Sequence, residues 1–343
     1  MRFLRWMAAA CVLLLVSCGP AETAATPEYS VPPEEKRLCI YTSHKREVWW
    51  PIVKEFEDRT GIWAEVTEGG TSELLNRIRA EQDHPKADIM FGGGAESLQS
   101  FSDLFTPYRA EGWERLDPQF QAEGDLWTPF SALPLVLIYN SKLLEEEELK
   151  RWSDLEDHTF RGRIAFADPN RSGSSYTALV TMMEAEGKGE KALKLFALQL
   201  KGKQLDGSGD VPDAVGNGAA LAGITLEETA LKKIADGQTL TIVYPEEGTS
   251  AVPDGSALVA GAPHSGNAKL FLDFTLTEDV QNLIVQRYCR RSVLKNAAAS
   301  EDLPLLEDLR LISYDVKKAG EEREEPDHGI PETGRFLCSR RHL

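Results

Sequence analysis

Short apolar runs alternate with stretches of helical periodicity along the first third of the chain. Three such runs predict β-strands, at residues 38–41, 63–66 and 87–91. After each run, apolar residues recur at intervals of three or four, which predicts helices over 48–56, 74–78 and 98–104. Strands that alternate with helices favour an α/β fold with mostly parallel sheets and right-handed crossovers.

The later chain repeats this alternation. The strongest strand pattern, at 133–140, is expected to pass from a first lobe to a second, and the run at 255–260 is expected to return. Helical patterns are found at 142–151, 177–186, 190–200, 267–274 and 277–288. Beyond Val316 the chain is charged and poor in apolar residues, so we expect no regular structure there.

These patterns divide the chain into a signal peptide (1–17), a flexible tether (18–36), two lobes and a polar tail (317–343). The first lobe is expected to comprise 37–134 with 256–289, and the second 135–255 with 290–316. The chain between the tether and the tail is long enough for two lobes of the usual domain size.

The N-terminus has the pattern of a secretion signal. Arg2 and Arg5 precede an apolar core at about 7–16, which is too short for a membrane-spanning helix. The sequence Leu15-Val16-Ser17-Cys18 resembles the bacterial lipobox, whose cysteine is lipidated and becomes the first mature residue. We therefore expect a secreted protein with a lipid anchor at Cys18, on the outer face of the bacterial cytoplasmic membrane or its periplasmic side.

The net charge and the cysteines limit the kinds of partner and binding site that the sequence allows. The formal net charge is −17, which argues against nucleic acid, because nucleic acid requires a basic face. Outside the signal and the anchor, Cys39, Cys289 and Cys338 remain; this is an odd number, and whether Cys289 and Cys338 pair stays open. No CxxC or His/Cys spacing suggests a zinc site, and no cofactor is expected.

A hydroxyl-rich turn after the apolar run at 164–167 is the most informative stretch. Its residues are Asp168, Ser172, Gly173, Ser174 and Ser175. Unpaired backbone N–H groups and the positive end of a helix dipole suit an anion at such a turn. A single turn of this kind is more often an ordinary helix cap.

Similar segments follow the three N-terminal strands. They are Thr42, Ser43 and His44; Gly70, Thr71 and Ser72; and Gly92, Gly93 and Gly94. The carboxyl ends of parallel strands share one edge of a sheet, where ligands bind in folds of this kind. Because glycine allows close approach of a backbone, the four segments together predict an anion site between the lobes.

Five short motifs also follow one another in a recognisable order. They are Tyr41-Thr42-Ser43-His44-Lys45, Phe56-Glu57-Asp58-Arg59-Thr60-Gly61-Ile62, Asp168-Pro169 with Ser172-Gly173-Ser174, Tyr244-Pro245-Glu246-Glu247-Gly248-Thr249, and Arg290-Arg291-Ser292-Val293. The chain resembles the extracellular solute-binding proteins of ABC transporters, in the branch of ferric-iron, thiamine, phosphonate and sugar-phosphate binders. The resemblance covers about 37–315 and implies a type II periplasmic-binding fold, with two α/β lobes and a ligand cleft between them.

The resemblance also shows where this chain departs from the ferric binders. These supply a histidine in the first loop, a glutamate after the third strand and two adjacent tyrosines in the second lobe. His44 matches the histidine, but the nearest carboxylate to the second position, Glu96, lies two residues beyond Gly94, and Thr225 lies where the tyrosines would fall. Since Fe(III) favours anionic oxygen donors, ferric iron is disfavoured.

The remaining candidates suit phosphate or carboxylate oxygens. Arg290 and Arg291 can each present paired N–H donors to such a group, although a surface salt-bridge pair is an equally good interpretation. Tyr244 and Glu246 are expected near the hinge, where a glutamate would suit an ammonium group on the ligand. Glu227, close to Thr225, is a further candidate contact.

The sequence therefore predicts a monomeric, non-enzymatic receptor that delivers a small anionic solute, phosphorylated or a phosphonate, to an ABC permease and its ATPase. A ferric-ion or thiamine-type binder is the alternative within this class. An extracellular phosphate-ester hydrolase is disfavoured, because the serines at 172–175 have no histidine near them in sequence and no Asp/His cluster has two-metal spacing. A ligand-sensing partner of a membrane kinase is not distinguished from a transport protein.

Overall fold

The computed structural model describes residues 32–145, 148–295, 297 and 303–324. The predicted signal peptide, Cys18, most of the tether, Cys338 and the chain beyond 324 lie outside the described residues. The end of the predicted tether is folded: Glu34–Lys36 form a 3₁₀ turn, and the Asn267 carboxamide donates to the Glu35 carbonyl at 3.1 Å. None of the helices within the described ranges is both long and apolar enough to cross a membrane.

Eight strands form the sheet, in the order β2-β1-β3-β8-β4-β6-β5, with β7 also paired to β4. Their bounds are β1 (Arg37–Thr42), β2 (Trp63–Glu68), β3 (Ile89–Gly94), β4 (Thr128–Tyr139), β5 (Ile164–Ala165), β6 (Ala222–Leu226), β7 (Thr241–Val243) and β8 (Ala251–Leu258). The parallel pairing predicted from sequence holds for β2-β1-β3 and for β5-β6. The pairs that involve β4 and β8 are antiparallel, because these two strands cross between the halves of the sheet.

The strand β4 connects the two halves. Its first part, from Thr128 to Pro134, pairs with β8, and its second part, from Leu135 to Tyr139, pairs with β6 and β7. β4 and β8 are therefore the crossing strands that the runs at 133–140 and 255–260 predict, although both begin earlier in the chain than expected.

Helices cover both faces of each half of the sheet, and apolar spacing explains their burial. Their bounds are α1 (Arg46–Thr60), α2 (Thr71–Ala80), α3 (Ala95–Gln99), α4 (Gly173–Glu186), α5 (Glu190–Leu200), α6 (Val211–Gly216), α7 (Glu227–Ala235), α8 (Ser265–Thr275), α9 (Glu278–Tyr288) and α10 (Val316–Glu324). Further 3₁₀ turns are Ser102–Leu104, Trp113–Arg115, Pro118–Phe120, Glu123–Asp125, Ser153–Glu156, His158–Phe160, Ser208–Asp210 and Leu306–Asp308. In α1, Val48, Ile52 and Phe56 are buried at the predicted spacing, and the helix ends at Gly61 with φ 66°.

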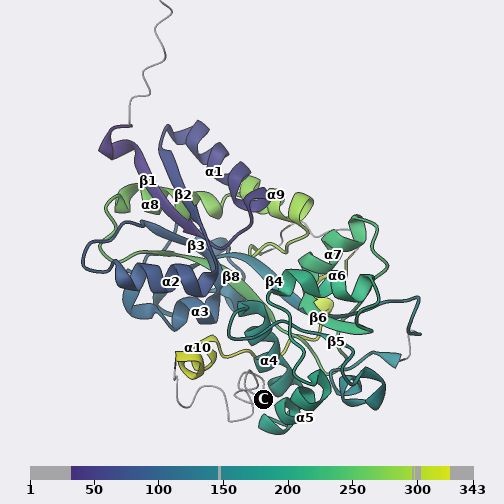
Figure 1. The fold of residues 1–343 in the computed structure, drawn as a ribbon. Coiled ribbons are helices and arrows are strands. Elements are labelled where there is room, and N and C mark those ends of the chain that lie inside the picture. Colours follow the sequence, from purple (N-terminus) through teal and green to yellow (C-terminus); the bar gives the residue numbers. More distant parts are fainter. Residues whose placement is uncertain (1–31, 146–147, 296, 298–302, 325–343) are drawn as a thin grey trace, which may run out of the picture. The chain divides into compact units, whose positions relative to one another are not determined.

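Apolar clusters identify two lobes (Figure 1). We call the first lobe the part in which α1, α8 and α9 pack on one face of β1 and β3, and α2 and α3 on the other. The second lobe is the part in which α4 and α5 pack on one face of β4 and β6, and α6 and α7 on the other. Val293 and Leu306, which the predicted division assigns to the second lobe, pack in the first-lobe cluster.

The helix predicted over 142–151 is absent from the described part of that segment, which forms turns. The Asn140 side chain accepts from the Lys142 N–H at 3.0 Å and starts the turn. Leu144 and Leu149 are both buried, and residues five apart would not share one face of a helix. The helix prediction is wrong, because Asn140 starts a turn and the two buried leucines do not lie on one helix face.

Three other boundaries differ from expectation. The helix after β3 is α3, at Ala95–Gln99, and is followed by the 3₁₀ turn Ser102–Leu104 rather than one helix at 98–104. The serine-rich turn is itself the first turn of α4, which begins at Gly173 instead of Thr177. The tail is not irregular throughout, because residues 316–324 form α10.

Candidate functional site

The predicted loops of the first lobe meet at one edge of the sheet. The Ser43 N–H donates to the Phe91 carbonyl at 3.3 Å, and the Gly69 N–H donates to the Thr42 carbonyl at 3.2 Å. The Thr42 hydroxyl donates to the same Phe91 carbonyl at 2.8 Å and accepts from the His44 N–H at 3.1 Å. Parallel pairing of β1 with β2 and β3 thus brings the three segments together, as predicted. We call this edge the rim.

Two glycines allow the segments of the rim to lie this close together. Gly92 and Gly93 have φ of 93° and 122°, which side chains other than glycine rarely adopt. A Cβ at Gly92 would lie 2.7 Å from the His44 Nε2, and one at Gly93 would lie 3.0 Å from the Thr71 Cγ2. These glycines belong to the end of β3 rather than to a loop after it, and they leave room for His44 and Thr71.

The start of α4 lies in the second lobe and is rich in hydroxyls. Ser172 is the N-cap, and its hydroxyl accepts from the Ser175 N–H at 3.3 Å. The Ser174 hydroxyl lies 3.2 Å from that of Ser172 and donates to Ser208 at 2.9 Å. Asp168 shapes the preceding turn, since its Oδ1 accepts from the Asn170 N–H at 2.9 Å.

The start of α4 faces the first lobe at short range. The Thr177 hydroxyl donates to the Glu96 carboxyl group of α3. A Cβ at Gly173 would lie 3.9 Å from the Ser97 hydroxyl and 4.0 Å from an Arg323 nitrogen, and one at Gly209 would lie 3.7 Å from the Lys45 ammonium. Arg323 therefore lies beside this helix start, and Lys45 lies beside the 3₁₀ turn that contains Ser208.

Glu96 is the buried acid at this contact. It is fully buried, and its Oε2 has no hydrogen-bond partner among the described residues. Burial raises the pKa of Glu96, against the hydrogen bond from Thr177 and the charge of Arg323. The protonated form is thus favoured more than for an exposed glutamate.

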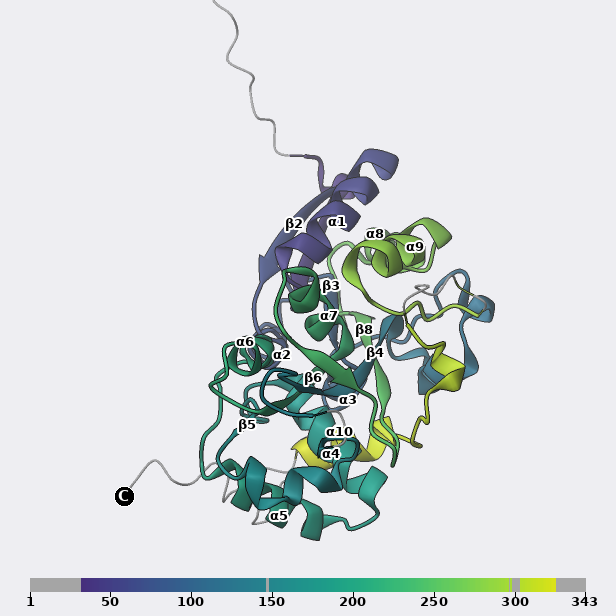
Figure 2. The ribbon, with the colours of Figure 1, turned by 90° about the vertical axis from the view of Figure 1, so that its right-hand side faces the viewer.

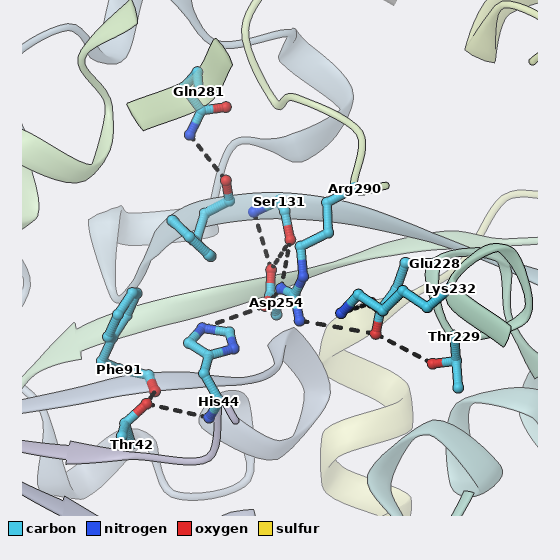
Figure 3. Close-up of polar contacts among 11 residues, drawn as sticks. Thr42, His44, Phe91, Ser131, Glu228, Thr229, Lys232, Asp254, Gln281 and Arg290 are labelled. Carbon is cyan, nitrogen blue, oxygen red and sulfur yellow. Dashed lines mark hydrogen bonds and ion pairs between the residues drawn. The ribbon is translucent and has the colours of Figure 1, made fainter. Parts of the chain in front are cut away.

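The predicted Arg290 lies in a network where the crossing strands meet (Figure 3). The Asp254 carboxylate on β8 accepts from the Ser131 N–H at 2.9 Å, the Ser131 hydroxyl at 2.6 Å and the Arg290 guanidinium at 2.6 Å. Arg290 also lies 4.0 Å from Glu228 of α7, which pairs with Lys232 at 2.7 Å. Although burial opposes it, the charges of Arg290 and Lys232 lower the pKa of Glu228.

His44 connects the rim to this network. Its Nε2 lies 3.5 Å from the Asp254 Oδ2 but has no hydrogen-bond partner among the described residues. Burial, together with the nearby charge of Arg290, holds the pKa of His44 well below its usual value. The ring also packs on Phe91 and Phe130, with centroids 4.6 Å and 5.1 Å away, so His44 is a neutral, enclosed side chain.

Arg291 is held by a separate ion pair with Glu227. Its guanidinium makes two hydrogen bonds of 2.8 Å to Glu227, which also accepts from the Tyr244 hydroxyl at 2.5 Å. Thr225 is buried and its hydroxyl has no partner within the described structure. Glu246 instead pairs with Arg151 at the surface, with an Nε–Oε2 distance of 2.6 Å.

The predicted site residues thus fall into two groups. The rim segments and the start of α4 come together, whereas Arg290, Arg291, Glu227 and Tyr244 are engaged with partners away from α4. Sequence reasoning missed Lys45, Ser97, Ser208 and Arg323 around α4, and Asp254, Ser131, Glu228 and Lys232 in the network. Lys45 directly follows His44, and Ser208 lies in a Gly/Ser turn, so both carried a signal; Arg323, in a charged tail, carried none.

Among the described residues, the rim coincides neither with a group of metal-binding side chains nor with the cavity beside α7 and α9. The described residues include no group of three or more His, Cys, Asp or Glu side chains that could hold a metal ion. A cavity of about 620 Å³ lies between α7, α9 and the segment at 303–307. Its lining includes Arg290 and Arg291 but none of the rim segments.

Comparison with known proteins identifies the family. A family model described as "bacterial extracellular solute-binding protein" matches residues 84–318. The chain belongs to this family.

Relatives of this solute-binding protein match between 69% and 90% of its length. Iron uptake protein A1 of Synechocystis is 24% identical over 90% of this chain and 89% of that protein. A probable ABC transporter periplasmic-binding protein of Sinorhizobium fredii is 24% identical over 80% of this chain and 79% of its own length. A putative 2-aminoethylphosphonate-binding periplasmic protein of Salmonella paratyphi A is 23% identical, over 69% and 71%.

Solved structures confirm the type II periplasmic-binding fold. The periplasmic binding protein AfuA from Actinobacillus pleuropneumoniae, with fructose-6-phosphate bound, matches with a TM-score of 0.77 at 26% identity, over 88% of this chain and 97% of that chain. Iron-bound HitA from Pseudomonas aeruginosa matches with a TM-score of 0.76 at 22% identity, over 88% and 99%. The relatives are binding proteins, in agreement with the prediction that this chain is not an enzyme.

Replacement of Arg290 by Leu should destabilise the solute-binding protein by about 3–5 kcal/mol, because it leaves Asp254 as a buried charge without its main partner. The free energy of unfolding from chemical denaturation measures this. Arg151→Leu, which removes an exposed pair with Glu246, is the control and should change the midpoint little. Equal effects of the two variants would contradict a central role for the Asp254 network.

His44 should make the fold sensitive to acid. A histidine whose pKa is lowered in the folded state binds fewer protons there, so its contribution to stability is present above the unfolded pKa of about 6.5 and decreases as the pH falls below it. His44→Gln should therefore flatten the fall in unfolding free energy between about pH 7.5 and 5.5. An unchanged slope would show that His44 is not enclosed in the neutral form.

His264 provides a control of opposite sign. Burial lowers its pKa, but hydrogen bonds and charge from Asp88 and Glu34 outweigh burial and raise it above 6.5. Its contribution is therefore present at low pH and is lost as the pH rises through the raised pKa. His264→Gln should steepen the loss of stability on acidification, where His44→Gln makes it shallower.

Proposed function

We propose that this protein is the solute-binding component of an ABC importer and captures a small anionic organic solute, phosphorylated or a phosphonate. The observation that carries the proposal is the start of α4. It presents the positive end of a 14-residue helix and the hydroxyls of Ser172 and Ser174. Arg323 lies beside it, and Lys45 lies beside the turn at 208–210 to which Ser174 bonds. Backbone N–H groups, hydroxyls and cations are the donors that oxyanions require.

The rim supplies the opposite side of the proposed site. Gly92 and Gly93 allow close approach of the backbone, and Thr71 and Ser43 add hydroxyls from the first lobe. An oxyanion between the rim and α4 would accept bonds from both lobes, so binding would favour their closed arrangement. The first lobe is proposed to be 37–134 with 256–289 and the second 135–255 with 290–316, except that Val293 and Leu306 pack with the first; β4 and β8 form the hinge.

The relatives support both parts of the proposal. One is a probable ABC transporter periplasmic-binding protein, which favours a permease and an ATPase as partners. AfuA was solved with fructose-6-phosphate, and another relative is a putative 2-aminoethylphosphonate-binding protein. Both named ligands carry phosphorus oxyanions.

A ferric-ion binder is the second candidate, because iron uptake protein A1 is among the relatives. The described side chains favour it less. His44 is enclosed against Phe91, Phe130 and Asp254, and the pKa of the nearby Glu96 is raised by burial. No tyrosine pair stands at 224–226. The carboxylates of the network beside His44 are already paired, Asp254 with Arg290 and Glu228 with Lys232, which leaves few of the anionic oxygens that Fe(III) favours.

A thermal-shift screen tests the ligand class directly. Purified protein is compared with fructose 6-phosphate, 2-aminoethylphosphonate, thiamine and Fe(III) citrate, after native mass spectrometry has shown what co-purifies. A ligand at about 100 times its dissociation constant stabilises the fold by about 2.7 kcal/mol, which such a screen resolves. Stabilisation by Fe(III) alone would overturn the anionic-solute proposal.

Ser174→Ala should weaken binding of the best phosphorus compound by about tenfold or more. The reason is that a hydrogen bond to a charged group contributes about 1.5–3 kcal/mol. Isothermal titration calorimetry measures the effect, with Ser141→Ala, at an exposed serine after β4, as the matched control. Unchanged affinity in Ser174→Ala would reduce the start of α4 to an ordinary helix cap.

We also propose that Cys18 carries lipid and anchors the mature protein. The support is the sequence Leu15-Val16-Ser17-Cys18 after a short apolar core. Cys18→Ala should move the protein from the membrane fraction to the soluble fraction of the bacterial cell. Mass spectrometry of wild-type protein should find a lipidated N-terminal cysteine, and an unmodified mature protein that begins elsewhere would contradict the anchor.

A further inference from the structure

The helix α10 packs against α3 of the first lobe at backbone distance. Ala319 is buried, and a Cβ at Gly320 would lie 3.0 Å from the Glu96 carbonyl and 3.1 Å from the Gln99 Cβ. Only the smallest side chains permit this contact, since any larger residue at 320 would meet the α3 backbone. The α10 helix is therefore seated closely on α3.

The same helix contacts α4 of the second lobe through side chains. The Tyr176 hydroxyl donates to the Ala319 carbonyl at 2.7 Å, and the Tyr176 ring lies 4.8 Å from the Arg323 guanidinium. The Lys318 ammonium of α10 lies 3.6 Å from the Glu184 carboxylate of α4. Figures 1 and 2 show α10, in yellow, beside α3 and α4 in both views.

These contacts lie next to the proposed site. Glu96 and Ser97 of α3 follow the rim glycines, and Tyr176 follows the serines of α4. The Arg323 guanidinium donates to the Ser97 hydroxyl at 2.8 Å, which places α10 beside the contacts of α3 with α4, at Glu96–Thr177 and near Ser97–Gly173. Any movement of α4 away from α3 must therefore break one set of α10 contacts.

We propose that α10 is a strap that holds the two lobes closed, stays on α3 and releases α4 when the lobes open. The contact with α3 is made at backbone distance at Gly320. The contact with α4 is made by side chains: the Tyr176 hydrogen bond and ring contact, the exposed Lys318–Glu184 pair, and the packing of Ala319 against Tyr176 and Val180. Each of these side-chain contacts is weak by itself. This inference goes beyond the proposed function and rests on it only in that a captured solute needs lobes that open.

The test measures lobe separation without ligand, so it does not depend on the identity of the solute. Spin labels are attached through a non-canonical amino acid at exposed Glu55 of α1 and Lys194 of α5, and electron–electron distances are recorded. Tyr176→Phe removes only the hydroxyl, and should shift the closed-to-open ratio toward the open form by about two- to tenfold. Gly320→Leu should shift it further, because it displaces α10 from α3.

Tyr108→Phe is the matched control, because that hydroxyl bonds to Asp273 within the first lobe at 2.9 Å. It should leave the distance distribution unchanged. Circular dichroism melting of each variant verifies folding, and Tyr176→Phe keeps the test decisive if Gly320→Leu fails to fold. Distance distributions identical to wild type in Tyr176→Phe, or an equal shift in Tyr108→Phe, would overturn the strap. If no ligand in the thermal-shift screen stabilises the protein but Tyr176→Phe still shifts the distance distribution, only the proposed solute is overturned.

Discussion

The ion pair between Asp254 and Arg290 fixes the place where the two lobes meet. Asp254 lies on β8, at the register shifts in its pairing with both β3 and β4, and its carboxylate also accepts from Ser131 of β4. A buried carboxylate needs compensating donors. The crossing strands and the chain after α9 are therefore held in one arrangement, and His44 extends this arrangement to the rim.

The contact among α3, α4 and α10 is built from weaker interactions. There the lobes meet through the Glu96–Thr177 hydrogen bond and through α10, and the burial of Glu96 disfavours its charged form. Breaking neutral hydrogen bonds costs less than separating a buried ion pair, because no charge is left without a partner in the protein interior. The Asp254 network is therefore expected to stay intact when the lobes open, and the contacts of α10 with α4 are expected to separate first.

Sequence reasoning recovered the features that depend on local order. Apolar periodicity located β1 to β3, α1 and the crossing strand β4, and the glycine and hydroxyl pattern located the rim, since parallel strands must bring their carboxyl ends together. It did not find Asp254, Ser131 or Arg323, because their partners lie 123, 159 and 226 residues away in the chain. It placed a helix at 142–151, where Asn140 starts a turn instead.

The contact between α10 and α3 limits which residues such a segment can carry. Its acceptor for Tyr176 is a main-chain carbonyl, which every residue type at 319 would supply, and its fit to α3 requires a very small residue at 320. The requirement at these two positions is therefore one of volume rather than polarity, because Ala319 packs against Tyr176 and Val180, whereas Arg323 also contributes a hydrogen bond to Ser97. Two adjacent small residues in a charged terminus are the mark by which a comparable docking helix would be recognised in another chain.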